Sequence, residues 1–566
     1  HCTRLCHASS VAALMEGIGS GAVTAPFTTC KDSDLIIVIG ANPTENHPVA
    51  ATFFKQAVKR GATLVVMDPR GQALKRHATH MLQFNPGADV AMLNAMLNVI
   101  ISEDLYDKQY VESQTEGFAQ LQQHIADFTP EAMAEICGID AETLRTVARA
   151  YARAESAIIF WGMGISQHIH GTDNARCLIA LSLITGQVGR PGSGLHPLRG
   201  QNNVQGACDM GTLPNVFPGY QKVADAGSIE KFAQAWSLQQ REQLFSDNTG
   251  LTVTEMIDGC LTGNVKGLYI LGENPLMTDP DLNHVREAMQ ASEFTVLQEI
   301  FPSETADYAD VLLPGASFAE KSGTFTNTER RIQLIRPALT PPGEARADWD
   351  IISDLALRVM SEAKQSTTGE YAGWEYTSAA EIMDEIAALT PSYAGVSHDR
   401  LEQGTQLHWP VPDASHPGTP ILHVDRFTSG KGHFHLTEHL PAAELPDSEY
   451  PLFLTTGRVL YHWHGAEMTR RSSTLIALCP RSMVEIAEED AEQLGIKNNQ
   501  SIKVISRRGE MLATASINER VPEGVVFGNF HFPDEANVNN LTNAALDPIA
   551  KIPEYKVCAV RVEALV

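Results

Sequence analysis

Long apolar runs and paired cysteines are both missing from this sequence. The longest apolar stretches are short, such as Leu35–Ile39, whereas a membrane-spanning helix needs roughly 18 apolar residues in succession. The 9 cysteines are scattered and form no C-x-x-C pair, which argues against a disulfide framework and against a zinc ribbon. We therefore expect no membrane contact from this chain and a reducing, cytoplasmic location.

Positively charged residues are scarce relative to acidic ones. The chain has 42 Lys and Arg against 68 Asp and Glu, and its formal net charge is -26. A charge of this sign repels a phosphate backbone and an anionic lipid surface, so nucleic acids and membranes are not expected partners. An initiating methionine is missing too. The numbered chain starts at His1, inside a motif, and we expect further residues ahead of it in the natural protein.

The sequence does contain an informative internal repeat. Two apolar strands, Leu35–Ile39 and Gly267–Leu271, each run into the same turn, Gly-x-Asn-Pro. A second apolar run follows each turn and ends in an acid, Asp68 in one case and Glu299 in the other. The intervals between the runs are long enough for a crossover helix, which predicts two βαβ units with parallel strands.

Each of these units is typical of a mononucleotide-binding half. In such sheets ligands lie beyond the carboxyl ends of the strands, and an acid after the second strand commonly binds ribose hydroxyls. The pair of units therefore predicts sites for two nucleotides. The alternative at this point is a doubly wound fold whose strand endings bind no nucleotide.

The remaining patterns complete the predicted fold. At 566 residues and 43% hydrophobic composition, the chain is long enough for about three to five domains. After Tyr450 it turns into short β-rich runs separated by Gly, Pro and Asn, which predicts a small terminal β-barrel. We expect a multidomain α/β protein with two Rossmann-like αβα domains related by the repeat, plus this C-terminal barrel. The predicted domains are 1–201, 202–330, a helical and irregular connection at 331–444, and the barrel at 445–566.

A reactive cysteine is predicted near the start of the chain. Cys6 is followed by His7 and then by a helix expected from Val11, with Ser9 or Ser10 as its cap. A thiol near a helix N-terminus, with an imidazole beside it, favours the thiolate, which is the form that binds a metal. The alternative is an inert cysteine at a helix entrance.

A second segment suits the capture of a small anion. Arg199 stands in a loop rich in glycine and side-chain amides, which is too irregular for a helix or a central strand. Glycines let the backbone approach a bulky ligand, and the amides offer donors and acceptors to a polar heterocycle. Arginine suits bidentate binding of a planar carboxylate. The alternative for Arg199 is a helix cap or a surface salt bridge.

Taken together, these residues resemble a known family over nearly the whole chain. Cys6-His7, Arg199 and the residues that follow it, the second Gly-x-Asn-Pro turn and the closing Pro-Glu-Tyr-Lys are similar to the catalytic (alpha) subunit of molybdenum- or tungsten-dependent formate dehydrogenases, within the molybdopterin oxidoreductase family. The turn and the barrel, which is of the double-psi type in this family, fit any member. The adjacent Cys-His pair and the Arg199 loop select formate dehydrogenase.

The resemblance implies a cofactor and a reaction. A molybdenum or tungsten ion with a terminal sulfido ligand would lie between two molybdopterin guanine dinucleotides, with Cys6 as its protein ligand. His7 would accept or relay a proton, and Arg199 would orient formate during its reversible two-electron oxidation to CO2.

The resemblance also implies which residues surround the two dinucleotides. The first would be bound by Gly40, Asn42, Asp68, Arg70, Gly87 and Asp89, and the second by Gly272, Asn274, Pro275 and Gln298. The pterin pocket would be lined by Gly162, Met163, Gly164, Gln201, Asn202, Gly206 and Asp209. The barrel would contribute Thr456, Gly457, Arg458, His464, Asn539, Tyr555 and Lys556.

One part of the family pattern has no counterpart in the numbered chain. Family members carry a [4Fe-4S] domain ahead of the metal-binding cysteine, and we expect it in the segment that precedes His1. The expected partners are electron-transfer subunits with flavin and further iron-sulfur clusters, delivering electrons to NAD.

Two other functions stay open. A nitrate reductase of the same family also uses cysteine ligation, although His7 and the Arg199 loop favour formate. A non-catalytic electron-transfer subunit, like the large iron-sulfur subunit of respiratory complex I, shares the fold without needing a metal site. The presence of Cys6, His7 and Arg199 together argues against it.

Overall fold

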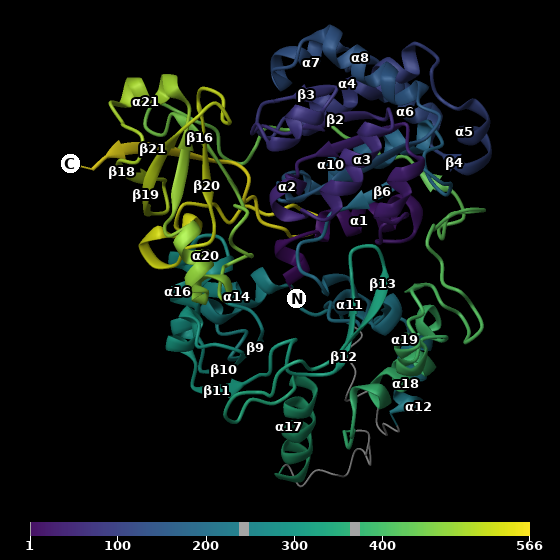
Figure 1. Ribbon diagram of the computed structural model, residues 1–566, viewed down its shortest axis with the longest axis vertical. Helices are drawn as coiled ribbons and strands as arrows, with labels where there is room; N and C mark the ends of the chain where they lie inside the picture. Colours follow the sequence, from purple (N-terminus) through teal and green to yellow (C-terminus); the bar gives the residue numbers. More distant parts are fainter. Residues whose placement is uncertain (1, 237–247, 363–373, 566) are drawn as a thin grey trace. The chain divides into compact units, whose positions relative to one another are not determined.

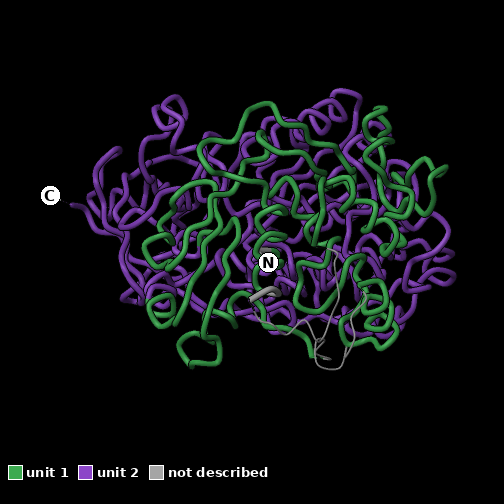
Figure 2. The backbone as a smooth tube through the Cα atoms, turned by 90° about the horizontal axis from the view of Figure 1, so that it is seen from below, with its two compact units in different colours: residues 1–3, 201–274, 287–420 green, residues 4–200, 275–286, 421–566 purple. Residues whose placement is uncertain are grey.

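The computed structural model describes residues 2–236, 248–362 and 374–565, which form two compact units. The larger unit comprises 4–200, 275–286 and 421–566, and the smaller unit comprises 1–3, 201–274 and 287–420 (Figure 2). The four consecutive domains predicted from sequence do not coincide with this division. The first αβα segment and the terminal barrel share the larger unit, and a buried ion-pair network joins them.

A five-stranded parallel sheet forms the first part of the larger unit (Figure 1). Its strands lie in the order β3-β2-β1-β5-β6. Their bounds are β1 Leu35–Ile39, β2 Thr63–Met67, β3 His80–Leu82, β5 Ala157–Trp161 and β6 Gly194–Pro197. β1 and β5 are buried along their whole length, as expected for parallel strands covered on both faces. The parallel pairing of β1 with β2 agrees with the parallel strands predicted for the first unit, whereas the relation of two whole Rossmann-like domains by the repeat stays a prediction.

Helices cover both faces of this sheet. Leu35 and Ile37 of β1 pack into the cluster that contains α4 and α10, whereas Ile36 and Val38 pack with α3. This alternation follows from the two-residue period of a strand. The helices of this part are α1 Ala8–Ile18, α2 Pro43–Asn46, α3 Ala50–Lys59, α4 Asp89–Ser102, α5 Lys108–Gln114, α6 Phe118–His124, α7 Pro130–Cys137, α8 Ala141–Arg153, α9 Met163–Ser166 and α10 Gly171–Ile184. A short parallel pair joins β4 Thr115–Glu116 to β15 Gly432–His433.

The C-terminal part of the larger unit is a closed barrel, in agreement with the predicted terminal β domain. Its strand order is β16-β20-β17-β19-β18-β21. The strands are β16 Leu452–Gly457, β17 Met483–Ile486, β18 Ser501–Ile505, β19 Glu510–Ile517, β20 Val525–Asn529 and β21 Cys558–Ala564. The helices are α20 Ser473–Leu478 and α21 Glu488–Leu494. Its interior is apolar, with Leu454, Val484, Ile502 and Val560 all buried.

A buried ionic network links the first sheet to the barrel. Arg70, just after β2, donates from Nε and Nη2 to the two carboxylate oxygens of Glu485 on β17, both at 2.7 Å. The guanidinium carbon also lies 3.7 Å from the centre of the Phe527 ring. Glu45 and Arg520 extend the network, with Arg520 2.9 Å from Glu45 and 3.2 Å from Glu485. Bidentate pairing of this kind fixes orientation as well as distance.

The smaller unit contains the second copy of the repeat. β9 Gly267–Leu271, β10 Phe294–Glu299 and β11 Val311–Pro314 are parallel in the order β11-β10-β9, which is the order of β3-β2-β1 in the first copy. The other strands are β7 Val216–Phe217, β8 Gln221–Lys222, β12 Gly323–Thr326, β13 Arg331–Ile335 and β14 Leu407–His408. The helices are α11 Val204–Asp209, α12 Ala226–Ala235, α14 Val253–Thr262, α17 Asp348–Glu362, α18 Ala379–Leu389 and α19 His398–Glu402.

The connection after β9 leaves the smaller unit. α15 Pro275–Thr278 belongs to the larger unit, and the division falls inside α16 Leu282–Ala291. Across all described residues, none of the helices combines the length and apolar character needed to cross a membrane.

Candidate active site

The predicted metal ligand Cys6 immediately precedes the turn that opens α1. Its side chain is buried, and its sulfur lies 3.4 Å from the Sδ atom of Met163, the first residue of α9. Met163 is one of the predicted pterin-pocket residues. The loop after β5 therefore brings Met163 to the predicted metal ligand.

The start of α1 differs from the prediction. The helix begins at Ala8 with His7 in the N-cap position, so the expectation that Ser9 or Ser10 caps it is wrong. Both serines lie in the first turn and are buried, and both bond with Ser166. Ser9 Oγ donates to the Ser166 carbonyl at 2.9 Å, and the two hydroxyls of Ser10 and Ser166 are 2.7 Å apart. The serines fix the helix against the loop after β5, and this tertiary role overrides their capping preference.

Both ring nitrogens of His7 are engaged within the larger unit. Nε2 donates to the carbonyl oxygen of Leu198 at 3.0 Å, and Nδ1 accepts from the Ser166 hydroxyl at 3.1 Å. Burial, and then the nearby charge of Arg199, lower the pKa of His7 to about 3. The ring is therefore neutral at pH 7. It ties the Cys6-His7 turn to the residue that precedes Arg199.

Arg199 is buried and stands at the beginning of the predicted loop, just after β6. Its Nη2 donates to the carbonyl oxygen of Gly21 at 2.6 Å. Its own carbonyl oxygen accepts from Nε2 of His47 at 2.8 Å. Burial lowers the pKa of His47 to about 4, so this ring is neutral as well. His47 was not predicted from the sequence, where it stands in Asn-His-Pro after the first Gly-x-Asn-Pro turn.

Two further cations from the barrel lie near Cys6. Burial lowers the pKa of Arg458 to about 10, and the charge of Cys6 opposes this effect. Burial likewise lowers the pKa of Lys556 to about 8, opposed by Asp68 and Cys6. A thiolate and a bound anion would both be stabilised by these cations, because charges interact strongly where water is excluded. The cations, Cys6 and Arg199 thus form a positively charged, anion-attracting centre within one unit.

The loop that carries Arg458 and His464 is fixed by a histidine outside the prediction. Arg458 Nη2 donates to His464 Nε2 at 2.9 Å. His531 Nδ1 donates to the His464 carbonyl at 2.6 Å, and its Nε2 accepts from the Val459 amide at 2.9 Å. A Cβ atom on Gly200 would lie 2.5 Å from Arg458 Nη2 and 2.8 Å from a ring carbon of His464, so a larger residue here would displace these two side chains. The barrel loop therefore packs directly on the residue after Arg199.

The other predicted barrel residues mostly bond to backbone. The Thr456 hydroxyl donates to the Tyr555 carbonyl at 2.8 Å, and Gly457 packs on the Phe527 ring. Asn539 Nδ2 and the Tyr555 hydroxyl donate to carbonyl oxygens of α15, at 3.0 and 2.9 Å, just after the predicted Pro275. These residues join the barrel to α15.

Three predicted glycines allow two loops to cross. Gly40 has a positive φ of 56°, and a Cβ on it would lie 2.8 Å from the backbone carbon of Gly164. The Gly164 amide donates to the Gly40 carbonyl at 2.9 Å, and a Cβ on Gly162 would lie 2.7 Å from that same oxygen. Close approach of the loops after β1 and β5 thus requires glycine at all three positions.

Polar groups suited to a nucleotide gather at the carboxyl ends of β1, β2 and β3. Within the described part of the chain, the buried atoms here that have no hydrogen-bond partner include Asn42 Nδ2, Gln72 Oε1 and Asp89 Oδ1. Gln72 Nε2 donates to the Ala41 carbonyl at 2.7 Å, which places Gln72 beside Asn42. Burial raises the pKa of Asp68 and of Asp89 to about 6. Unsatisfied buried polar atoms are costly, and a bound polar ligand removes that cost.

The residues predicted for the first dinucleotide thus include buried donors and acceptors whose chemistry fits a polar ligand. Gly87, with a positive φ of 79°, leads into α4, which begins at Asp89. Arg70 is turned toward Glu485 and forms part of the link to the barrel. Gln72 was not predicted, and its position four residues after Asp68 is the only signal for it.

The remaining predicted residues belong to the smaller unit. Asp209 is buried, and it accepts from Gln205 at 2.7 Å, from the Tyr220 hydroxyl at 2.9 Å and from the Tyr393 hydroxyl at 2.6 Å. Gly206 packs on the side-chain oxygen of Asn203. Gln201 is half-buried and Asn202 is exposed, in the turn before α11.

The second Gly-x-Asn-Pro turn makes bonds within its own unit. Asn274 donates to Glu304 at 2.7 Å and accepts from the Thr305 hydroxyl at 2.8 Å. Gln298 donates to Asp348 at 2.8 Å. Gly272 has a positive φ of 59°, and a Cβ on it would meet no atom of the described residues within 4 Å, so conformation rather than crowding explains glycine here.

Comparison with protein families identifies the class to which this chain belongs. The family described as Molybdopterin oxidoreductase matches residues 1–358, and the one described as "Molydopterin dinucleotide binding domain" matches residues 452–559. The chain therefore belongs to the molybdopterin oxidoreductase family. The second match covers most of the barrel.

Individual relatives refine this placement. The chain is 46% identical over 565 residues to the alpha subunit of the F420-dependent formate dehydrogenase of Methanocaldococcus jannaschii, covering 100% of this chain and 81% of that protein. It is 37% identical to formate dehydrogenase H of Escherichia coli (99% of this chain, 77% of that protein) and 34% identical to the assimilatory nitrate reductase catalytic subunit of Bacillus subtilis (99% and 78%). The resemblance to formate dehydrogenase catalytic subunits, and with it the expectation of a molybdopterin-dependent enzyme, is confirmed.

A solved structure supports the fold. The acetylene hydratase of Pelobacter acetylenicus matches with a TM-score of 0.78 and 20% identity, covering 100% of this chain and 82% of that chain. At this identity the match concerns the fold alone.

Proposed function

We propose that this chain oxidises formate to CO2 at a molybdenum or tungsten ion held by Cys6 and two molybdopterin guanine dinucleotides. The observation that carries the proposal is the bond from His7 Nε2 to the Leu198 carbonyl, which joins the Cys6 turn to the Arg199 loop. A soft metal ligand and a carboxylate-binding guanidinium are thereby fixed to one another through two short peptide segments. Identities of 43–46% to three formate dehydrogenase alpha subunits support the same activity.

Each residue has a role that follows from its surroundings. Arg199, buried, offers a planar cation to the planar formate carboxylate, and Arg458 adds positive charge near Cys6. With a pKa of about 3, His7 does not keep a proton at pH 7, but it can pass on the proton released when formate becomes CO2, a proton and two electrons. To do so it must give up the bond that Nδ1 accepts from Ser166. When bound, the metal cofactor supplies the two-electron acceptor that no side chain provides.

Buried polar atoms of the larger unit that have no hydrogen-bond partner support the proposed binding of the cofactor. Asn42, Gln72 and Asp89 would bind one dinucleotide, and Lys556 beside Asp68 adds a cation suited to a phosphate. We propose the second dinucleotide for Gly272, Asn274 and Gln298 of the smaller unit. The terminal sulfido ligand and the [4Fe-4S] cluster stay predictions from the family resemblance.

The electron acceptor has two candidates. The sequence resemblance favours NAD, reached through flavin and iron-sulfur subunits in the cytoplasm. Coenzyme F420 is the second candidate, because three relatives that are 43–46% identical carry F420 in their names. Supplying each acceptor to the purified complex with formate separates them, since only the physiological one supports turnover at low concentration.

Substitution of Arg199 tests the proposed substrate. The metal-loaded protein should reduce a viologen dye with formate, and Arg199→Ala should lose this activity. Arg199→Lys keeps the charge but not the planar fork, so its KM for formate should rise about tenfold, which corresponds to about 1.4 kcal/mol. Arg149→Ala, which removes an exposed guanidinium on α8, is the matched control and should leave KM unchanged.

The same metal-loaded protein is tested with nitrate, the alternative substrate. Reduced viologen with nitrate should give no turnover. Nitrate reduction without formate oxidation, or an Arg199→Ala variant with normal formate kinetics, would refute the proposal.

A further inference from the structure

The backbone that carries Arg199 is held by two imidazoles from different segments of the chain. His7 Nε2 donates to the carbonyl oxygen of Leu198 at 3.0 Å, and His47 Nε2 donates to the carbonyl oxygen of Arg199 at 2.8 Å. Two consecutive peptide carbonyls are thus fixed from outside the loop. His7 comes from the Cys6 turn, whereas His47 comes from the segment after the first Gly-x-Asn-Pro turn.

Anchors of this kind matter because the loop is intrinsically flexible. Glycine stands at 192, 194 and 200, and glycine loses more conformational freedom on ordering than any other residue. One further bond, from Arg199 Nη2 to the Gly21 carbonyl at 2.6 Å, holds the side chain itself. A guanidinium that must meet a small anion at a fixed distance from Cys6 needs its own backbone fixed, since small misplacements reduce binding and rate.

The surroundings of His47 define its hydrogen-bonding state. A carbonyl can only accept, so Nε2 carries the proton, and Nδ1 lies 2.9 Å from Oδ1 of Asn46. With Nδ1 unprotonated, the Asn46 amide turns its NH2 group toward the ring and donates to it. Burial and the charge of Arg458 disfavour a second proton on the ring. His47 therefore acts as a neutral donor of fixed direction.

We propose that His47 is a positioning residue for Arg199, setting the place of its guanidinium through the bond to the Arg199 carbonyl. The inference rests on the proposed function, because it concerns the residue that binds formate. His47 itself touches no substrate in this assignment. Its removal should weaken formate binding more than it slows the reaction once formate is bound.

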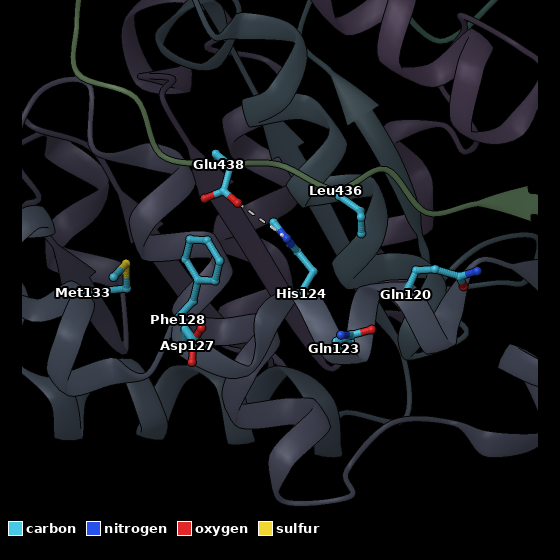
Figure 3. Close-up of a pocket in the computed structure, with 8 residues that line it drawn as sticks. All are labelled: Gln120, Gln123, His124, Asp127, Phe128, Met133, Leu436 and Glu438. Carbon is cyan, nitrogen blue, oxygen red and sulfur yellow. Dashed lines mark ion pairs between the residues drawn. The ribbon is translucent and has the colours of Figure 1, made fainter.

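Two substitutions at position 47 and one control test this role. His47→Leu removes the donor and keeps an apolar side chain of related size. His47→Gln restores a donor, because the amide nitrogen of Gln lies as many bonds from Cα as Nε2 of His. The control is His124→Leu. His124 Nε2 also bonds to a backbone carbonyl, that of Thr437, at 3.0 Å. His124 lines the pocket shown in Figure 3, which is formed by a different part of the same unit.

We expect the substitution to change the KM for formate much more than kcat. His47→Leu should raise the KM for formate about tenfold, because one buried hydrogen bond is lost. Its kcat should stay within about threefold of the wild-type kcat. His47→Gln should stay within about threefold of the wild-type KM, and metal content should be unchanged in all three variants. His124→Leu should have the wild-type KM. A wild-type KM in His47→Leu, or a KM in His47→Gln as high as in His47→Leu, overturns the inference.

Hydrogen exchange gives a readout that does not depend on formate oxidation. Peptides covering residues 194–204 should exchange about tenfold faster in His47→Leu than in the wild type, because a carbonyl anchor is lost, and should be unchanged in His124→Leu. Unchanged exchange in His47→Leu overturns the inference even if the wild type proves inactive with formate. Inactivity of the metal-loaded wild type with faster exchange in His47→Leu refutes the proposed function while retaining the positioning contact.

Discussion

Removal of Arg70 should destabilise the junction between the first sheet and the barrel. The Arg70 and Glu485 side chains are 7% and 11% exposed and make two bonds of 2.7 Å. Breaking such a pair from one side leaves a buried charge and typically costs about 3–5 kcal/mol. Arg520 lies 3.2 Å from Glu485 and partly compensates, so we expect about 3 kcal/mol for Arg70→Met.

The double variant sharpens this prediction. Arg70→Met combined with Glu485→Met leaves neither of the two charges buried, and it should be less destabilised than Arg70→Met alone. Urea unfolding followed by circular dichroism gives the free energy of the first transition for each variant. Arg149→Met is the control. It removes a pair with Glu103 whose partners are about one-third exposed, so it should cost much less than Arg70→Met does.

Two results would contradict this role of the Arg70–Glu485 pair. If Arg70→Met changes the free energy of unfolding no more than the control does, the pair does not hold the junction. If the two single substitutions add in the double variant, the side chains act independently of each other. Either outcome would return Arg70 to the role expected from sequence, that of a residue free to face a nucleotide.

Two other predictions concern conformation and pH. Gly40→Ala should destabilise the protein by several kcal/mol, because its Cβ would meet the Gly164 backbone at 2.8 Å. The loss should be seen as a lower soluble yield and a lower melting temperature. The control is Gly61→Ala: Gly61 also has a positive φ, but a Cβ there meets no atom of the described residues within 4 Å, so this change should cost only about 1 kcal/mol. Burial lowers the pKa of His531 from 6.5 to about 3, so the unfolded chain binds this proton first. The contribution of the neutral His531 ring to the free energy of unfolding is therefore full above pH 6.5. It is lost as the pH falls toward 3, by up to about 5 kcal/mol in all. His531→Asn should flatten the pH dependence of stability in that window, and an unchanged slope would contradict this.

Much of the fold follows from local sequence patterns. The repeated strand and Gly-x-Asn-Pro turn give β1 and β9, and both copies place their strands in the same parallel order. The short β-rich runs separated by turn residues after Tyr450 predict the C-terminal barrel. The two units could not be predicted, because the chain leaves and re-enters the larger unit at 275–286, and this exchange depends on tertiary contacts that no local pattern encodes.

The site was predictable only where a residue type carries its own chemistry. Cys6, His7 and Arg199 stand out by type and neighbours, and the structure brings the three into one unit. His47, His531 and Gln72 escaped prediction because each acts through a contact that is distant in sequence or whose importance appears only on burial. The serines of α1 show the opposite case, in which a local capping preference was overridden by packing on Ser166.

The most direct test of the account is the formate-dependent reduction of a viologen dye, per bound metal, by wild-type protein and by Cys6→Ser. The control is Cys137→Ser, a buried cysteine at the end of α7. We predict that the wild type and the control turn over at similar rates and that Cys6→Ser loses about 100-fold or more, since a directly bound metal ligand matters at least as much as the groups that orient it. Formate oxidation by Cys6→Ser at the wild-type rate would contradict the assignment of Cys6 as the metal ligand and, with it, the proposed centre.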